Sequence, residues 1–189
     1  MGKQRLEAFT DGVVAIIITI MVLELKVPAQ PTLASLKTET PLLLAYALSF
    51  TNVGIFWNNH HHMLHATERI NGAVLWANLA LLFALSLVPF VIRWMDEAHY
   101  APVPTASYGA VLLMAGIAYL LLEKALIKCN GPHSKLAQAI GNEAKGKLSM
   151  AGYASAIPLA FVGPWISIVV YVAIALMWFV PDRRIESLF

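Results

Sequence analysis

Long apolar segments are the feature that most constrains this chain, because they leave little sequence for anything else. At about 20 residues per bilayer crossing, the hydropathy pattern indicates six membrane-spanning helices. Hydrophobic residues make up 59% of the chain and charged residues 13%, which is outside the range of ordinary soluble domains. We therefore predict an all-α polytopic membrane protein, with residues 1–189 forming one six-helix transmembrane domain. The expected spans are 6–27, 41–62, 71–93, 105–126, 148–163 and 164–180.

Basic residues predict how the chain lies across the membrane, because cytoplasmic loops carry an excess of Lys and Arg. With six spans and the N-terminus inside, 10 of the 13 Lys and Arg residues fall on the cytoplasmic side and 3 on the outer side. Both ends are then cytoplasmic, in a multi-pass protein of the cell membrane. The cytoplasmic set is Lys3, Arg5, Arg69, Lys124, Lys128, Lys135, Lys145, Lys147, Arg183 and Arg184; the outer set is Lys26, Lys37 and Arg93.

The segments between the spans carry no evident chemistry. Residues 28–40 contain prolines and small polar residues and are expected to form an outer loop. Residues 123–147 are expected to be a cytoplasmic loop with an amphipathic piece near the lipid headgroups, and nothing in them favours nucleic-acid binding. Pro89 is expected to kink the third span, and Gly163 and Pro164 to separate the last two.

The first span combines a narrow apolar stripe with an acidic residue. At about 100° per residue, the stripe falls within roughly one quadrant of the helix. Asp11 lies on the opposite side, together with Ala15, Ile18 and Val22. Periodicity alone favours a packed helix face for such a stripe over the lining of a pore. The stripe consists of Ile16, Thr19, Ile20 and Leu23, and Val27 continues it.

Polar residues gather at the cytoplasmic ends of the first three spans. An acid, an indole N–H or an amide in lipid needs a partner, and these residues share one depth in the membrane. We therefore expect Asp11 to be hydrogen-bonded in a scaffold, so that Asp11→Ala lowers assembly or expression before it alters ion preference. The expected partners are Arg5, Thr10, Trp76, Asn78 and one of His60 or His61.

Trp76 and the histidines of this region also have other interpretations. Trp76 would also suit the aromatic belt at the membrane interface. The histidines that follow Trp57 invite a metal site, with His61 and His65 one helical turn apart. A metal site is disfavoured, because no cysteine and no carboxylate other than Glu68 lies close by.

Several short motifs resemble those of a known family. The motif Arg5-x-x-x-Phe9-Thr10-Asp11 resembles the Arg-x-x-x-Phe-Ser-Asp signature of the transmembrane-protein-175 family of lysosomal potassium channels and their bacterial relatives, with threonine in place of serine. The resemblance covers roughly the first half of the chain. Further matching positions are Trp57, His60, His61, Leu75, Trp76, Asn78, Leu79, Pro89 and Phe90.

The resemblance implies a cation channel that is selective, strongly or weakly, for potassium. It implies a homotetramer in which the first helix of each subunit lines a central pore, with K⁺ as the permeant ion and other monovalent cations also permeant where selectivity is weak. The constriction would be apolar, unlike a filter of backbone carbonyls, whose Thr-Val-Gly-Tyr-Gly loop is absent here. By position, Ile16, Ile20 and Leu23 would form the narrow rings of the gate and Thr19 the hydroxyl layer that gives selectivity.

Two other functions remain open from the residues alone. A proton-coupled or proton-conducting transporter could relay protons through Asp11 and the His60 and His61 cluster. An intramembrane enzyme could use Asp11 with one of these histidines as an acid/base pair. The chain has no Gly-rich phosphate loop, nucleophile elbow or zinc-protease motif, so neither enzymatic activity nor a cofactor is expected. Passive potassium flux in liposomes would favour the channel.

Overall fold

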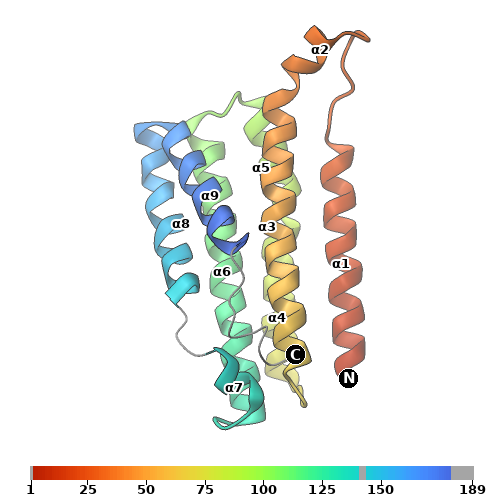
Figure 1. Ribbon diagram of the computed structural model, residues 1–189, viewed down its shortest axis with the longest axis vertical. Coiled ribbons are helices and arrows are strands. Elements are labelled where there is room, and N and C mark those ends of the chain that lie inside the picture. The colour runs from red at the N-terminus through yellow and green to blue at the C-terminus, as the bar shows by residue number, and fades with distance from the viewer. Residues whose placement is uncertain (1, 141–143, 180–189) are drawn as a thin grey trace.

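The described secondary structure of the chain is entirely helical. The computed structural model describes residues 2–140 and 144–179, and Arg183 and Arg184 of the predicted charge pattern lie outside this range. The long helices run along one common direction, with α1 at one edge, α6 near the middle and the α8–α9 pair at the other edge (Figure 1). The helices are α1 (Lys3–Leu23), α2 (Leu33–Thr38), α3 (Thr40–His65), α4 (Gly72–Ser86), α5 (Val88–Glu97), α6 (Pro102–Asn130), α7 (Lys135–Ile140), α8 (Ala144–Val162) and α9 (Pro164–Phe179).

Among the described residues, four helical segments are long and apolar enough to cross a membrane, which supports the predicted membrane protein and corresponds to the first four expected spans. The last two expected spans correspond to α8 and α9. The described part of α8 carries Lys145 and Lys147 in its first turn, and the described part of α9 has 16 residues and reaches the last described residue. The four segments are Lys3–Leu23, Thr40–His65, Gly72–Glu97 and Pro102–Asn130.

The helices differ from the predicted ones on both sides of the first outer loop, where polar side chains form ion pairs and helix caps. α1 ends at Leu23, before the predicted Val27, and the chain that follows is tied to α5: Lys26 Nζ lies 2.6 Å from Asp96 Oδ2. The segment predicted as a loop contains α2, whose first turn is capped because Thr32 accepts a hydrogen bond from the Ser35 N–H at 3.2 Å.

α6 continues to Asn130, beyond the predicted end at residue 126. The Asn130 side chain forms hydrogen bonds with the backbone of the segment between α3 and α4. Its Oδ1 accepts from the Glu68 and Arg69 N–H groups at 3.1 and 2.9 Å, and its Nδ2 donates to the Arg69 carbonyl at 2.9 Å. These bonds satisfy the backbone of a turn that has no helix of its own. At the kink predicted near Pro89 the helix is interrupted: α4 ends at Ser86, and Pro89 lies in the first turn of α5. The predicted joint at Gly163 is confirmed.

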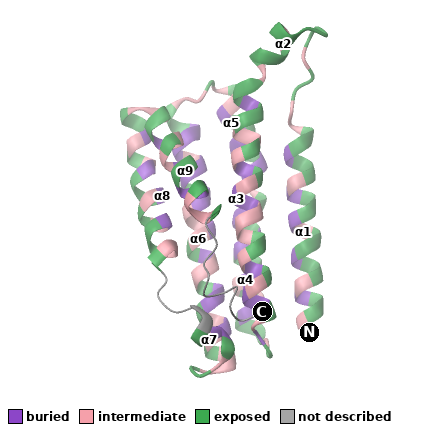
Figure 2. Cartoon of the chain, viewed as in Figure 1, coloured by how far each residue is buried: buried purple, intermediate pink, exposed green. Residues whose placement is uncertain are grey.

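α6 lies at the centre of the packing and buries side chains against helices on both sides. Leu112, Leu122 and Leu126 are among its fully buried residues. Close approach of α9 depends on Gly109, because a Cβ at this position would overlap the Tyr171 hydroxyl oxygen. That hydroxyl donates to the Thr105 carbonyl at 3.0 Å, which gives it a partner inside an apolar region. The arrangement leaves α1 free to expose one whole side (Figure 2).

Candidate pore helix and its polar anchors

α1 has one buried face, which attaches it to the rest of the subunit. Its buried residues recur every three or four positions, the period of one helix face. This face packs toward α3, α4 and α5. Hydrophobicity alone would not select one rotation of α1, because apolar residues occur on all of its sides. The packing of this face against the neighbouring helices, together with its one buried polar residue, Thr10, determines which side points outward. The buried residues are Leu6, Thr10, Val14, Ile17 and Met21.

The opposite face of α1 carries the predicted apolar stripe, and it points away from the subunit. Ile16 is 60% exposed, Ile20 42% and Leu23 75%. Val27 is also exposed but lies beyond the end of the helix. A surface of large apolar side chains on one side of an edge helix either faces lipid or covers another protein surface.

Thr19 lies within this exposed stripe and its hydroxyl is already oriented. Its Oγ1 donates to the Ala15 carbonyl oxygen at 2.8 Å. A hydroxyl has one donor and two acceptor lone pairs, so donating back to the helix leaves only acceptor capacity facing outward. An oxygen presented in this way suits a cation or a water molecule bound to one.

A buried hydrogen-bonded triad joins α1, α3 and α4. Asn78 Nδ2 donates to Thr10 Oγ1 at 2.9 Å, and Asn78 Oδ1 lies 2.8 Å from His60 Nε2. All three side chains are buried. With the amide oxygen as acceptor, His60 carries its proton on Nε2. Because buried polar groups are costly without partners, the triad holds α1 in one rotation and one depth relative to its neighbours.

Asp11 is anchored separately from this triad. Its Oδ1 accepts a hydrogen bond from Trp57 Nε1 at 2.8 Å, near an exposed surface of α1 and α3. One turn closer to the N-terminus, Glu7 Oε1 lies 3.4 Å from His61 Nδ1. Trp57 and His61 stack with ring centroids 6.1 Å apart. These contacts form a second link between α1 and α3.

The single scaffold expected around Asp11 is therefore divided in two. Asn78 bonds to Thr10 and to His60, Asp11 bonds to Trp57, and His61 pairs with Glu7. Trp76 is 75% exposed, which agrees with the interfacial alternative and not with a bond to Asp11. Arg5 and Phe9 are also exposed on α1. Trp57, which the sequence marks as a position of the family motif, is the partner of Asp11.

The histidines do not form a metal site in the part of the chain that the structure describes. Within it, no group of three or more His, Cys, Asp or Glu side chains is arranged to hold a metal ion. His60 is already bonded to Asn78, and the rings of His61 and His65 stack with centroids 6.2 Å apart. The histidines thus pack and form hydrogen bonds along α3.

Comparison with known proteins tests the resemblance seen in the motifs. The family model of the endosomal/lysosomal potassium channel TMEM175 matches residues 5–89. A Chryseobacterium protein named as a potassium channel is 51% identical to this chain, over 99% of this chain and 97% of the relative. The chain belongs to the TMEM175 family.

Other TMEM175 proteins show how far the likeness extends. The crystal structure of a lysosomal potassium-selective channel TMEM175 homologue from Chamaesiphon minutus matches with a TM-score of 0.78 and 30% identity, over 93% of this chain and 95% of that one. The human endosomal/lysosomal proton channel TMEM175 is 34% identical over 64% of this chain, which corresponds to 26% of the human protein. The TMEM175 match covers α1, α3 and α4, where the stripe, the triad and the Asp11 anchor lie.

Proposed function

We propose that this protein is a potassium-selective cation channel in which the α1 helices of four identical subunits line a central pore. The observation that carries the proposal is the outward-facing stripe of α1, with Ile16, Ile20 and Leu23 exposed on the side opposite the buried face. Potassium is proposed as the permeant ion because relatives of this chain are named as potassium channels. We further infer that the chain crosses the cell membrane six times, so that both termini are cytoplasmic. The six crossings are α1, α3, the α4–α5 pair, α6, α8 and α9.

The stripe would act as an apolar constriction. Ile16, Ile20 and Leu23 are spaced i, i+4 and i+7, so four copies would stack apolar rings over about 10 Å of the pore axis. A narrow apolar ring excludes water and blocks ions by dewetting. Conduction would then require the helices to move apart or rotate. Thr19, between two of these rings, offers the only side-chain oxygen of the stripe to an ion that has lost part of its hydration shell.

We expect the assembled protein to be a homotetramer. α1 lies at the edge of the subunit, and one edge helix cannot surround a pore. Native mass spectrometry of the purified protein in detergent should give a species of four chains, each of 20.7 kDa. Membrane extracts cross-linked before solubilisation provide the control for dissociation in detergent. A monomer or dimer as the largest species in both preparations would refute this assembly.

Replacing Thr19 with valine should lower the preference for potassium over sodium while conduction persists. Valine keeps the branched shape and removes the oxygen that the pore would present. Reversal potentials under mixed potassium and sodium measure the effect, and we expect the permeability ratio to fall several-fold, since losing about 1 kcal/mol of ion interaction changes the ratio roughly fivefold. Thr19→Ser, which keeps the hydroxyl, is the matched control. Unchanged selectivity in the valine variant would remove Thr19 from the conduction pathway.

A proton-conducting function is the second candidate. Titratable side chains meet at one end of α1, where Glu7 pairs with His61 and Asp11 lies one turn further along. The human relative is named as a proton channel. Liposomes that carry both a potassium-sensitive and a pH-sensitive dye separate the two functions. Proton flux without passive potassium flux would favour the second one.

A further inference from the structure

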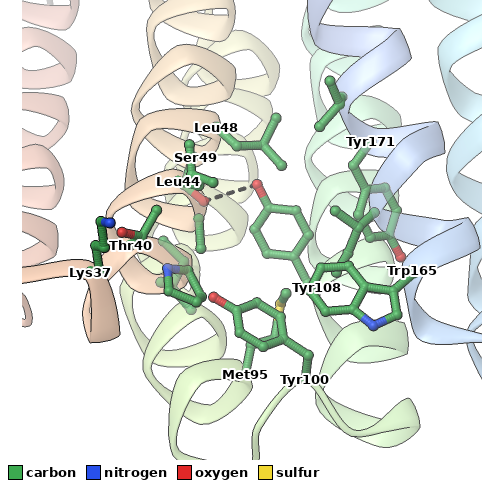
Figure 3. Close-up of a pocket in the computed structure, with 15 residues that line it drawn as sticks. Lys37, Thr40, Leu44, Leu48, Ser49, Met95, Tyr100, Tyr108, Trp165 and Tyr171 are labelled. Atoms are coloured by element: carbon green, nitrogen blue, oxygen red, sulfur yellow. Dashed lines mark hydrogen bonds between the residues drawn. The ribbon is translucent and has the colours of Figure 1, made fainter. Parts of the chain in front are cut away.

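A partly open apolar pocket lies at the α2 end of the bundle, far from the N-terminal end of α1. Its volume is about 420 Å³, within the range of small-molecule sites. Side chains from α2, α3, α5, α6 and α9 and from the α5–α6 link surround it (Figure 3). The apolar lining includes Leu44, Leu48, Ile92, Met95, Trp165 and Val172.

Most polar groups around the pocket already have partners. The Tyr108 hydroxyl is bonded to Ser49 at 2.9 Å and accepts from Asn52 at 3.2 Å. The Tyr171 hydroxyl donates to the Thr105 carbonyl. These groups offer little to a ligand, so the inner part of the pocket is effectively apolar.

Tyr100 is different, because its hydroxyl oxygen is buried and has no hydrogen-bond partner among the described residues. The residue is held in place by a left-handed backbone conformation, with φ of 58° following φ of 48° at His99. Such a conformation is rare for side chains other than glycine, asparagine and aspartate and is maintained by surrounding contacts. One of these is stacking on Trp165, with ring centroids 5.5 Å apart. An unpaired buried donor calls for a hydrogen-bond acceptor at this position, from water or from a ligand oxygen.

A positively charged side chain, Lys37, lies at the same pocket. Lys37 of α2 is exposed, lines the pocket and makes no ion pair with the described residues. Two other basic side chains at this end of the bundle already form ion pairs: Lys26 with Asp96, and Arg93 with Glu24 and Glu97. Figure 3 shows the Tyr100 hydroxyl directed toward the side of the pocket that carries Lys37 and Thr40. Burial raises the pKa of Tyr100 to about 12, so the phenol stays protonated and can donate to an anion at neutral pH.

We propose that this pocket binds an anionic phospholipid, with an acyl chain in the apolar cavity and the phosphate at Lys37 and the Tyr100 hydroxyl. The helix ends around the pocket place it at the level where lipid headgroups meet the protein. An acyl chain gains little by moving from bilayer to protein, because both are apolar; it fills a space that would otherwise lack dispersion contacts. Choice among lipids therefore comes from the two polar groups.

The test is native mass spectrometry of the purified protein titrated with phosphatidylglycerol or with phosphatidylcholine of the same acyl chains. We expect tighter retention of phosphatidylglycerol by the wild type. Lys37→Gln and Tyr100→Phe should each weaken phosphatidylglycerol binding several-fold and remove most of the preference over phosphatidylcholine. Lys124→Gln is the charge control, because Lys124 is exposed near the opposite end of α6. Equal retention of both lipids by the wild type would overturn the proposal.

A second pair of variants tests the cavity itself. Ala45 lines the pocket, and Ala47, two residues further along α3, is exposed outside it. Ala45→Trp should fill the cavity and abolish retention of the bound phospholipid. Ala47→Trp adds the same side chain to the same helix and should leave retention unchanged. Equal phosphatidylglycerol binding by the two variants would place the lipid elsewhere on the protein.

Discussion

Replacing Ile16 with asparagine is expected to raise potassium leak through the resting channel. Ile16 is the first ring of the exposed stripe, and four copies would surround the pore axis. An amide in place of a branched alkyl group hydrates the ring and lowers the dewetting barrier. A barrier change of about 1.4 kcal/mol, shared by four side chains, already increases flux about tenfold. Potassium flux into proteoliposomes, normalised to the amount of assembled protein, measures the effect.

Val22→Asn is the matched control for this experiment. Val22 is also an exposed apolar residue of α1, but it lies about a third of a turn away from the Ile16 stripe. The same amide on this side should leave the leak near the wild-type value. Equal leak in both variants would mean that asparagine perturbs the helix in general, and unchanged leak in Ile16→Asn would mean that α1 does not form the gate.

The sequence was sufficient to predict the helices whose signals are local. Apolar segments of sufficient length predicted α1, α3, the α4–α5 pair and α6, and Pro89 predicted a kink near the junction of α4 and α5. The motif around Asp11 predicted the family, which the comparisons confirm. These features depend on hydropathy, backbone chemistry and short spacing, all of which can be read along one segment at a time.

Partner choice within the polar cluster could not be predicted from depth alone. Thr10 and Asp11 are adjacent in sequence, but successive residues of a helix point about 100° apart. Thr10 therefore meets Asn78 of α4, whereas Asp11 meets Trp57 of α3. Which neighbour lies on which side depends on how the helices pack together. The proposed lipid pocket could not be predicted for the same reason. Its lining comes from several helices, and its unpaired hydroxyl belongs to a loop residue, Tyr100.

Replacing Asn78 with leucine is expected to destabilise the protein more than any other polar change in this cluster. Asn78 is fully buried and bonded at both ends of its amide, to Thr10 and His60. Leucine of similar size would leave the His60 N–H and the Thr10 oxygen unpaired, at a cost of about 1–3 kcal/mol for each. The thermal midpoint in detergent should then fall by several degrees.

The triad also determines which side of α1 faces outward, so its loss should have a second effect. With Thr10 no longer held by Asn78, α1 would lose the polar contact that selects its rotation, and the yield of assembled protein should drop with the thermal midpoint. Asn58→Leu on α3 is the control, because Asn58 is exposed and the substitution is chemically identical. If the two variants have the same midpoint and the same yield of assembled protein, the triad does not anchor the helix. If Asn78→Leu alone loses both, the buried amide fixes α1 in the rotation that turns Ile16, Thr19 and Ile20 away from their own subunit.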